Sequence, residues 1–198
     1  MFYLTKPNAV EIRRFLEDRR ADVFSYEEIG ASRLAENIPN AAEYNIDHNR
    51  VRIGNGAEDY AKAVAAVKSW QMFALDWVEL HQPETPIVVG ENVAVLANHF
   101  GFWSLNASRI VYVFEEDDGA IEKYGFAYGT LTEHGESGEE RFMVEFNREN
   151  GEVWYDLYAF SKPAHILAQI GFPIARMLQK EFAEDSKKAM VRAVSSNF

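Results

Sequence analysis

The sequence contains no cysteine, which excludes disulfide bonds, thiol nucleophiles and metal sites built on cysteine. It also lacks any run of more than two lysines or arginines. Its 20 basic residues are outnumbered by 31 acidic ones, which gives a formal net charge of -11. A surface of this sign repels nucleic-acid backbones and anionic lipid, so neither is an expected partner.

Long hydrophobic runs are absent as well. No stretch approaches the roughly 18 apolar residues of a membrane span, and the first five residues are too short for a signal peptide, so we expect a cytoplasmic protein. No Gly-, Ser- or Pro-rich linker divides the chain. We therefore expect one domain over residues 1–198, with a helix and an irregular extension over 1–43 packed on a body over 44–195.

The spacing of apolar residues changes along the sequence. Apolar residues recur every three or four positions over 8–20, where Asn8 and Glu11 predict a capping box, and again over 57–74, where Asn55 is the expected cap. A strand is predicted over 44–53, and a long helix follows a break at 171–173. Between them the period falls to two, which predicts six strands over 76–81, 92–100, 104–115, 121–131, 140–147 and 152–160.

This order of elements defines a fold class. Short connections make neighbouring strands antiparallel, and a sheet of about seven strands needs one face covered by a long element. The sequence therefore predicts an α+β fold, in which a curved antiparallel sheet wraps a long C-terminal helix and an N-terminal helix is added. The layout resembles the START-like helix-grip fold, which implies a space between sheet and helix whose filling decides the function.

Particular stretches carry a closer resemblance, which runs from about residue 3 to residue 192. The chain is similar to "uncharacterised protein family 0548", found in bacteria and plants, for which no established reaction is implied. The matching blocks are DHNR (47–50), WVEL (77–80), NASRIVYV (106–113), GFAYGTL (125–131), GEERF (138–142) and VWYDL (153–157).

The predicted strand over 121–131 contains an alternation of small and large residues. Gly125, Ala127 and Gly129 fall on one face, and Tyr124, Phe126, Tyr128 and Thr130 fall on the other. Three small residues in a row leave a groove, and glycine in a strand marks the close approach of another backbone or a ligand. Either the long helix lies in this groove, or the groove lines a ligand cavity.

Arg109 is a charged residue in the middle of a predicted strand, on the same face as Ala107 and Val111. A guanidinium among apolar neighbours needs a carboxylate, a backbone carbonyl or an anionic ligand. Glu140 or Glu145 is the expected internal partner. The alternative is that Arg109, with Asn106 nearby, orients a ligand carboxylate or carbonyl.

These patterns favour a protein that binds a small, mostly apolar or amphipathic molecule between the sheet and the C-terminal helix. The expected ligand-binding residues are Asn106, Arg109, Tyr128, Thr130, Glu140 and Tyr155. A second hypothesis is an enzyme in the same cavity, with Tyr128, Tyr155 and Glu140 moving protons beside Arg109. A third is a protein-docking module without a ligand, which uses either an acidic surface or the aromatic segment 100–103.

Metal and cofactor chemistry has little support in the sequence. The five histidines are far apart and form no two-histidine motif, and no phosphate-binding loop is present, so we expect neither metal nor cofactor. The acidic segment 132–141 contains His134 and is predicted as a loop. It is most simply a solvated turn, with a divalent-cation site as the weaker interpretation.

Overall fold

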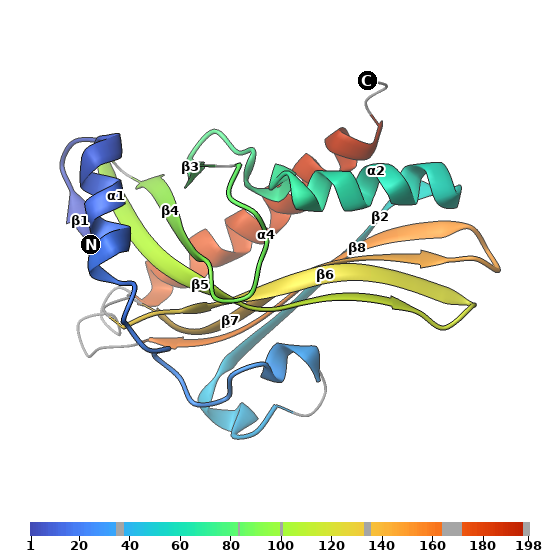
Figure 1. The fold of residues 1–198 in the computed structure, drawn as a ribbon, viewed down its shortest axis with the longest axis horizontal. Helices are drawn as coiled ribbons and strands as arrows, with labels where there is room; N and C mark the ends of the chain where they lie inside the picture. The colour runs from blue at the N-terminus through green and yellow to red at the C-terminus, as the bar shows by residue number, and fades with distance from the viewer. Residues whose placement is uncertain (35–37, 83, 100, 133–135, 164–171, 196–198) are drawn as a thin grey trace.

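The protein was analysed as a computed structural model that describes residues 1–34, 38–82, 84–99, 101–132, 136–163 and 172–195. Its described part is built on one antiparallel sheet of eight strands (Figure 1). The strand order is β2-β8-β7-β6-β5-β4-β3, and β1 pairs with β5. The predicted α+β helix-grip fold with a curved sheet and a long C-terminal helix is confirmed.

The strands follow the predicted order. They are β1 (Phe2–Tyr3), β2 (Asn45–Asn55), β3 (Val78–His81), β4 (Asn92–His99), β5 (Phe102–Asp117), β6 (Ile121–Thr130), β7 (Glu136–Asn147) and β8 (Glu152–Pro163). Strands β2, β5, β7 and β8 are longer than predicted, and β3, β4 and β6 are one or two residues shorter. The short β1 was not predicted.

Three α-helices are described: α1 (Ala9–Asp18), α2 (Gly56–Lys68) and α4 (Phe172–Ser195). The capping box at α1 is confirmed, because Asn8 Oδ1 accepts from the backbone of Val10 and Glu11 while the Glu11 carboxylate accepts from Asn8 N. The predicted break at 171–173 falls partly outside the described residues. None of the described helices is long and apolar enough to cross a membrane.

The predicted helix over 57–74 is wrong in its second half. Helix α2 ends at Lys68, and Trp70 adopts a left-handed conformation with φ of 58° before a 3-10 turn, η3 (Gln71–Phe73). The Asn55 side chain makes no capping bond at α2. Asp59 instead reaches back and accepts from Asn55 N at 2.8 Å.

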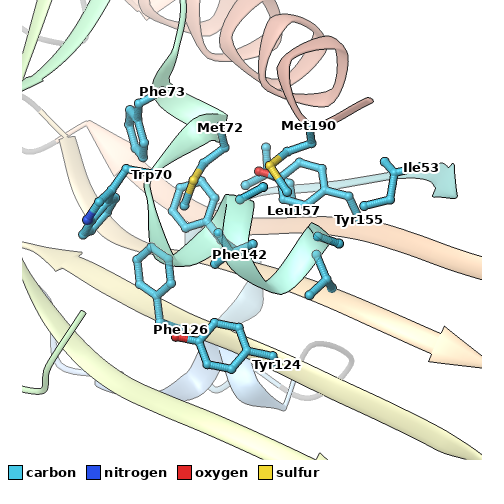
Figure 2. Packing of buried hydrophobic residues seen from close by; sticks show 14 of the residues in the cluster. Ile53, Trp70, Met72, Phe73, Tyr124, Phe126, Phe142, Tyr155, Leu157 and Met190 are labelled. Carbon is cyan, nitrogen blue, oxygen red and sulfur yellow. The ribbon is translucent and has the colours of Figure 1, made fainter. Parts of the chain in front are cut away.

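One face of the sheet, here called the helix face, is covered by α2, η3 and α4 (Figure 1). The main core lies between these layers, and Figure 2 shows rings of the sheet, such as Phe126 and Phe142, meeting Trp70, Met72 and Met190 from the covering side. Its central members are fully or almost fully buried, and they include Trp70, Met72, Phe126, Phe142, Tyr155 and Met190.

The opposite face, here called the segment face, is covered by residues from the first 44 positions. Helix α1 buries Ile12 and Phe15 against Leu105 and Leu131. Beyond α1, residues from 24–34 and 38–44 pack on β8, with Tyr26 and Tyr44 meeting the ring of Phe160 edge-on at 5.6 and 5.0 Å. The irregular extension is therefore part of the packed structure.

The small-residue groove of β6 lies on the segment face. A methyl group added to Gly129 would lie 2.0 Å from the Tyr26 hydroxyl, and one added to Gly125 would lie 2.8 Å from the Phe114 ring. Both readings of this groove are therefore wrong: Tyr26 and Phe114 occupy the space, and the long helix lies on the other side of the sheet. The glycines serve close packing.

The predicted loop over 132–141 is also wrong over its described part, since β7 begins at Glu136. A Cβ on Gly138 would lie 2.0 Å from the Phe160 carbonyl oxygen, so this glycine permits a close strand approach and forms no turn. As a result Glu139 and Glu140 are strand residues that face opposite sides of the sheet.

Gly129→Ala tests the packing of Tyr26 into the groove. The added methyl must displace the Tyr26 ring, so we expect a loss of about 1–3 kcal/mol in the free energy of unfolding, measured by urea denaturation. Removing the Tyr26 ring makes room for the added methyl group. Gly129→Ala combined with Tyr26→Ala should therefore cost less than the sum of the two single variants, and strict additivity would contradict the assignment.

Candidate functional site

A hydrogen-bonded pair on the helix face is the most distinctive polar feature of the core. Tyr128 on β6 lies directly opposite Glu140 on β7, and its hydroxyl donates to Glu140 Oε2 at 2.6 Å. The row continues across the sheet, since Glu140 pairs with Ala159 on β8 and Ala159 pairs with Asp47 on β2. Strand alternation sends all four side chains toward the helices.

A cluster of aromatic rings lies on one side of this pair. The ring of Tyr128 lies 5.3 Å from that of Phe142 and 6.2 Å from that of Phe73, measured between centroids. Phe73 also packs against Phe182 of α4 at 5.2 Å. The four rings come from two strands, η3 and α4, so the carboxyl of Glu140 stands at the edge of an aromatic cluster.

The pair is held in an apolar setting that changes its proton affinity. Burial raises the pKa of Glu140 from 4.5 to about 7, and the charge of Asp47 adds to this, while the hydrogen bond from Tyr128 acts in the opposite direction. Burial also raises the pKa of Tyr128, and the neighbouring Glu140 raises it further. Glu140 is therefore able to gain or lose a proton near neutral pH.

Helix α4 contributes polar groups to the same side of the sheet. Arg176 pairs with Asp47, and its Nη2 lies 2.8 Å from Asp47 Oδ1. One turn later, Gln179 Nε2 donates to Ser161 Oγ at 3.1 Å. These contacts fasten the first half of the helix through polar groups rather than through a continuous apolar seam.

Solvent reaches this part of the helix face. Asn106, Tyr128 and Glu140 on three successive strands are each partly exposed, as are Gln179 and Phe182 on the helix above them. Farther along the same face, Phe126 and Tyr155 have no exposed surface. The helix face is thus closed toward the C-terminal half of α4 and accessible beneath its N-terminal half.

The six predicted site residues do not all lie together. Tyr128 and Glu140 are paired on the helix face, and Asn106 is partly exposed on the same face, four residues along β5 from Ile110, the register partner of Tyr128. Tyr155 is on the same face but fully buried, and its hydroxyl is 2.8 Å from Ser186 Oγ on α4. Thr130 is 8% exposed, and its hydroxyl is taken by Ser25 at 2.6 Å and by Gly138.

Arg109 is on the segment face and makes its hydrogen bonds within the protein. Its Nη1 donates to the carbonyl of Asp22 at 2.7 Å, its Nη2 to those of Arg19 and Arg20, and its Nε to Asn92 Oδ1 at 2.7 Å. The predicted pairing with Glu140 or Glu145 is wrong: Glu140 lies on the helix face, and Glu145 lies on the segment face but pairs with Arg50 and Lys123. A cation among carbonyls just after α1 suits the negative end of a helix.

Sequence reasoning missed Asp47, Arg176 and Gln179. Asp47 occupies an inward position of a strand that was correctly located, so its alternation was an available signal. The sequence carries no signal for Arg176 and Gln179, because their hydrogen-bond partners are 129 and 18 positions away.

The described residues hold no group of three or more metal-binding side chains, and His134 lies outside them. A surface pocket of about 580 Å³ does occur, at the far end of the helix face. Arg52, Asp59 and Lys62 line it together with Val191 and Val194. It is separate from the Tyr128–Glu140 pair.

Comparisons with known proteins place this helix-grip chain in a family. Residues 25–189 match the model of a domain of unknown function, DUF1990. A UPF0548 protein of Dictyostelium discoideum is 40% identical over 211 residues, covering 100% of this chain and 97% of its own. One from Deinococcus radiodurans is 35% identical over 204 residues and 98% of both chains. The chain belongs to the UPF0548 family.

Solved structures with related folds are much more distant in sequence. A crystal structure of TTHA0849 from Thermus thermophilus has a TM-score of 0.49 at 15% identity and covers 77% of this chain and 100% of its own. Ara h 8.0201 has a TM-score of 0.48 at 14% identity and covers 78% and 99%. Neither comparison bears on function.

Glu140→Gln should change how stability depends on pH. The folded protein holds the Glu140 proton between pH 4.5 and about 7, whereas the unfolded chain releases it, so the free energy of unfolding falls as pH rises through this window. Glutamine removes this loss. From pH 5.5, above the pI near 4.9, to pH 8, the variant should gain about 2 kcal/mol relative to the wild type in urea denaturation.

Arg109→Met should act on stability alone. Four acceptors on the segment face each lose one hydrogen bond, and of these the Arg19 carbonyl keeps the donors Asp22 N and Asn92 Nδ2. We expect a fall of about 2–4 kcal/mol in the free energy of unfolding. Binding of any molecule at the helix face should be unchanged in the folded fraction at low temperature. Loss of binding without loss of stability would reverse this assignment.

Proposed function

We propose that this protein binds a small, mostly apolar molecule between the helix face and the N-terminal half of α4. The observation that carries the proposal is the Tyr128–Glu140 pair, which is accessible to solvent although it stands among core residues. Ligand sites are commonly apolar and aromatic, with a few convergent polar groups that fix orientation. The pair supplies such groups.

The surroundings of the pair agree with an apolar ligand. Val95 and Asn106 are paired and partly exposed on the same face of β4 and β5. Phe182 of α4 packs on Phe73, whose ring also lies near Tyr128. Exposed apolar side chains also occur on the first turns of α4, where Ile174 is 53% and Met177 is 48% exposed. An apolar molecule would gain by covering such surface.

A proton-transfer enzyme using the same residues is the second candidate. The specific observation in its favour is the pKa of Glu140 at about 7, which suits a general acid or base at neutral pH. The hydroxyl of Tyr128 would position the Glu140 carboxyl, and a substrate atom within hydrogen-bond reach of that carboxyl would be the reacting one. Tyr155, expected to share this task, is instead bonded to Ser186.

The protein-docking hypothesis rests on the exposed aromatic residues near the N-terminus. Phe102 on β5 is 49% exposed, and Phe2 on the paired strand β1 is 81% exposed. An aromatic docking surface at this edge stays a prediction of the sequence, because exposure by itself does not identify a partner.

Titration with the neutral dye Nile red tests the proposed ligand site. The wild type should bind one dye per chain, seen as a rise and blue shift of its fluorescence. Asn106→Trp places a large ring in the accessible space and should weaken binding at least tenfold. Ile46→Trp is the matched control, because Ile46 is 44% exposed on the segment face and should leave binding unchanged.

An absence of dye binding to the wild type, or equal loss in the two tryptophan variants, would contradict the proposal. Melting temperatures of both variants, measured alongside, show whether a loss of binding follows from unfolding.

A further inference from the structure

We infer that the polar end of the ligand is a cationic amine, held by the Glu140 carboxylate against the rings of Tyr128 and Phe182. This inference rests on the proposed function, because it names the chemistry of the molecule that the helix face would take. It is carried by the hydrogen bonds and charges around Glu140.

Glu140 has a neutral partner and no cationic one among the described residues. Its hydrogen bond comes from the Tyr128 hydroxyl, a donor that favours the ionised carboxyl over the protonated form. The neighbouring cation, Arg176, is already engaged by both carboxylate oxygens of Asp47. A carboxylate in an apolar setting is strongly stabilised by a paired cation, and the described part of the chain supplies none to Glu140.

The aromatic cluster is the second, independent feature. Tyr128 and Phe182 are partly exposed members of a four-ring cluster with Phe73 and Phe142. The faces of aromatic rings carry negative potential and attract ammonium groups, most strongly where water is partly excluded. A carboxylate at the edge of such a cluster offers a cation both a charged partner and a polarisable wall.

Other ligand charges fit less well. An anionic head group would meet Glu140, Asp47 and Glu136 on the sheet and would have to compete with Asp47 for Arg176. A neutral acceptor, such as a carbonyl, would bind the protonated form of Glu140. Amines and neutral acceptors therefore differ in how their affinity depends on pH. The affinity for an amine should rise as pH rises through 7, and the affinity for an acceptor should fall.

Five titratable or charged groups face Glu140 from the surrounding described elements. They are Asp47 on β2, Tyr128 on β6, Glu136 on β7, Tyr155 on β8 and Arg176 on α4. The tyrosines have pKa values raised by burial and stay neutral below pH 9, and Arg176 stays charged. Burial also raises the pKa of Glu136, so its ionisation acts in the same direction as that of Glu140.

Three probes with the same ring and different head groups test the inference by calorimetric titration. They are 1-naphthylmethylamine, 1-naphthylmethanol and 1-naphthoate. At pH 8 the amine should bind about tenfold more tightly than the alcohol, and the naphthoate should bind more weakly than either. Between pH 6 and pH 8 the affinity for the amine should rise several-fold, while that for the alcohol should not rise.

Glu140→Gln should reduce amine affinity to about the level of the alcohol and abolish its pH dependence, while alcohol affinity changes much less. Glu145→Gln is the matched control: it makes the same change on the same strand, but Glu145 lies on the segment face beside Arg50 and Lys123. It should leave all three affinities unchanged.

Equal or weaker binding of the amine relative to the alcohol would overturn the inference and leave the proposed ligand site standing. Tightest binding of the naphthoate, or an amine preference that survives Glu140→Gln, would also overturn it. If none of the three probes binds the wild type, the proposed function fails together with the inference.

Discussion

Strand alternation at β7 is the constraint on which the rest of the structure depends. Glu139 and Glu140 are adjacent in sequence, and the pleat sends them to opposite sides of the sheet. Glu139 is 2% exposed on the segment face, where it accepts hydrogen bonds from the Tyr26 hydroxyl, from Gly30 N and from the backbone and hydroxyl of Ser32. Glu140 points the other way, into the accessible part of the helix face.

The two glutamates therefore have different roles: Glu139 stabilises the fold, and Glu140 belongs to the proposed ligand site. A buried carboxylate is tolerated only when its oxygens are saturated with donors, and the chain over 26–32 supplies them to Glu139. That segment in turn fills the groove above Gly129 and leaves no room for a guest there. Glu140 accepts one hydrogen bond within the described chain, from the neutral Tyr128 hydroxyl. Its carboxylate can therefore accept further hydrogen bonds from a ligand on the helix face.

Much of this arrangement could be predicted from sequence, because it depends on local pattern. The α1 capping box, the order of the strands, the long C-terminal helix, and the placement of Tyr128 opposite the groove all follow from period and spacing. What could not be predicted depends on partners far along the chain. Tyr26 fills the groove from a distant segment near the N-terminus, and the carbonyls that bind Arg109 belong to Arg19, Arg20 and Asp22, 87 to 90 positions before it.

The two halves of α4 are held to the sheet by different kinds of interaction. Toward its C-terminus the helix buries Met190 and Val194 in the apolar core, and the Tyr155–Ser186 hydrogen bond is sealed from water. Toward its N-terminus the Phe182 ring packs on Phe73, and the remaining contacts are the hydrogen bonds of Arg176 and Gln179, which water can replace at little cost. The half of α4 above Glu140 is therefore the half whose polar contacts with the sheet water can replace.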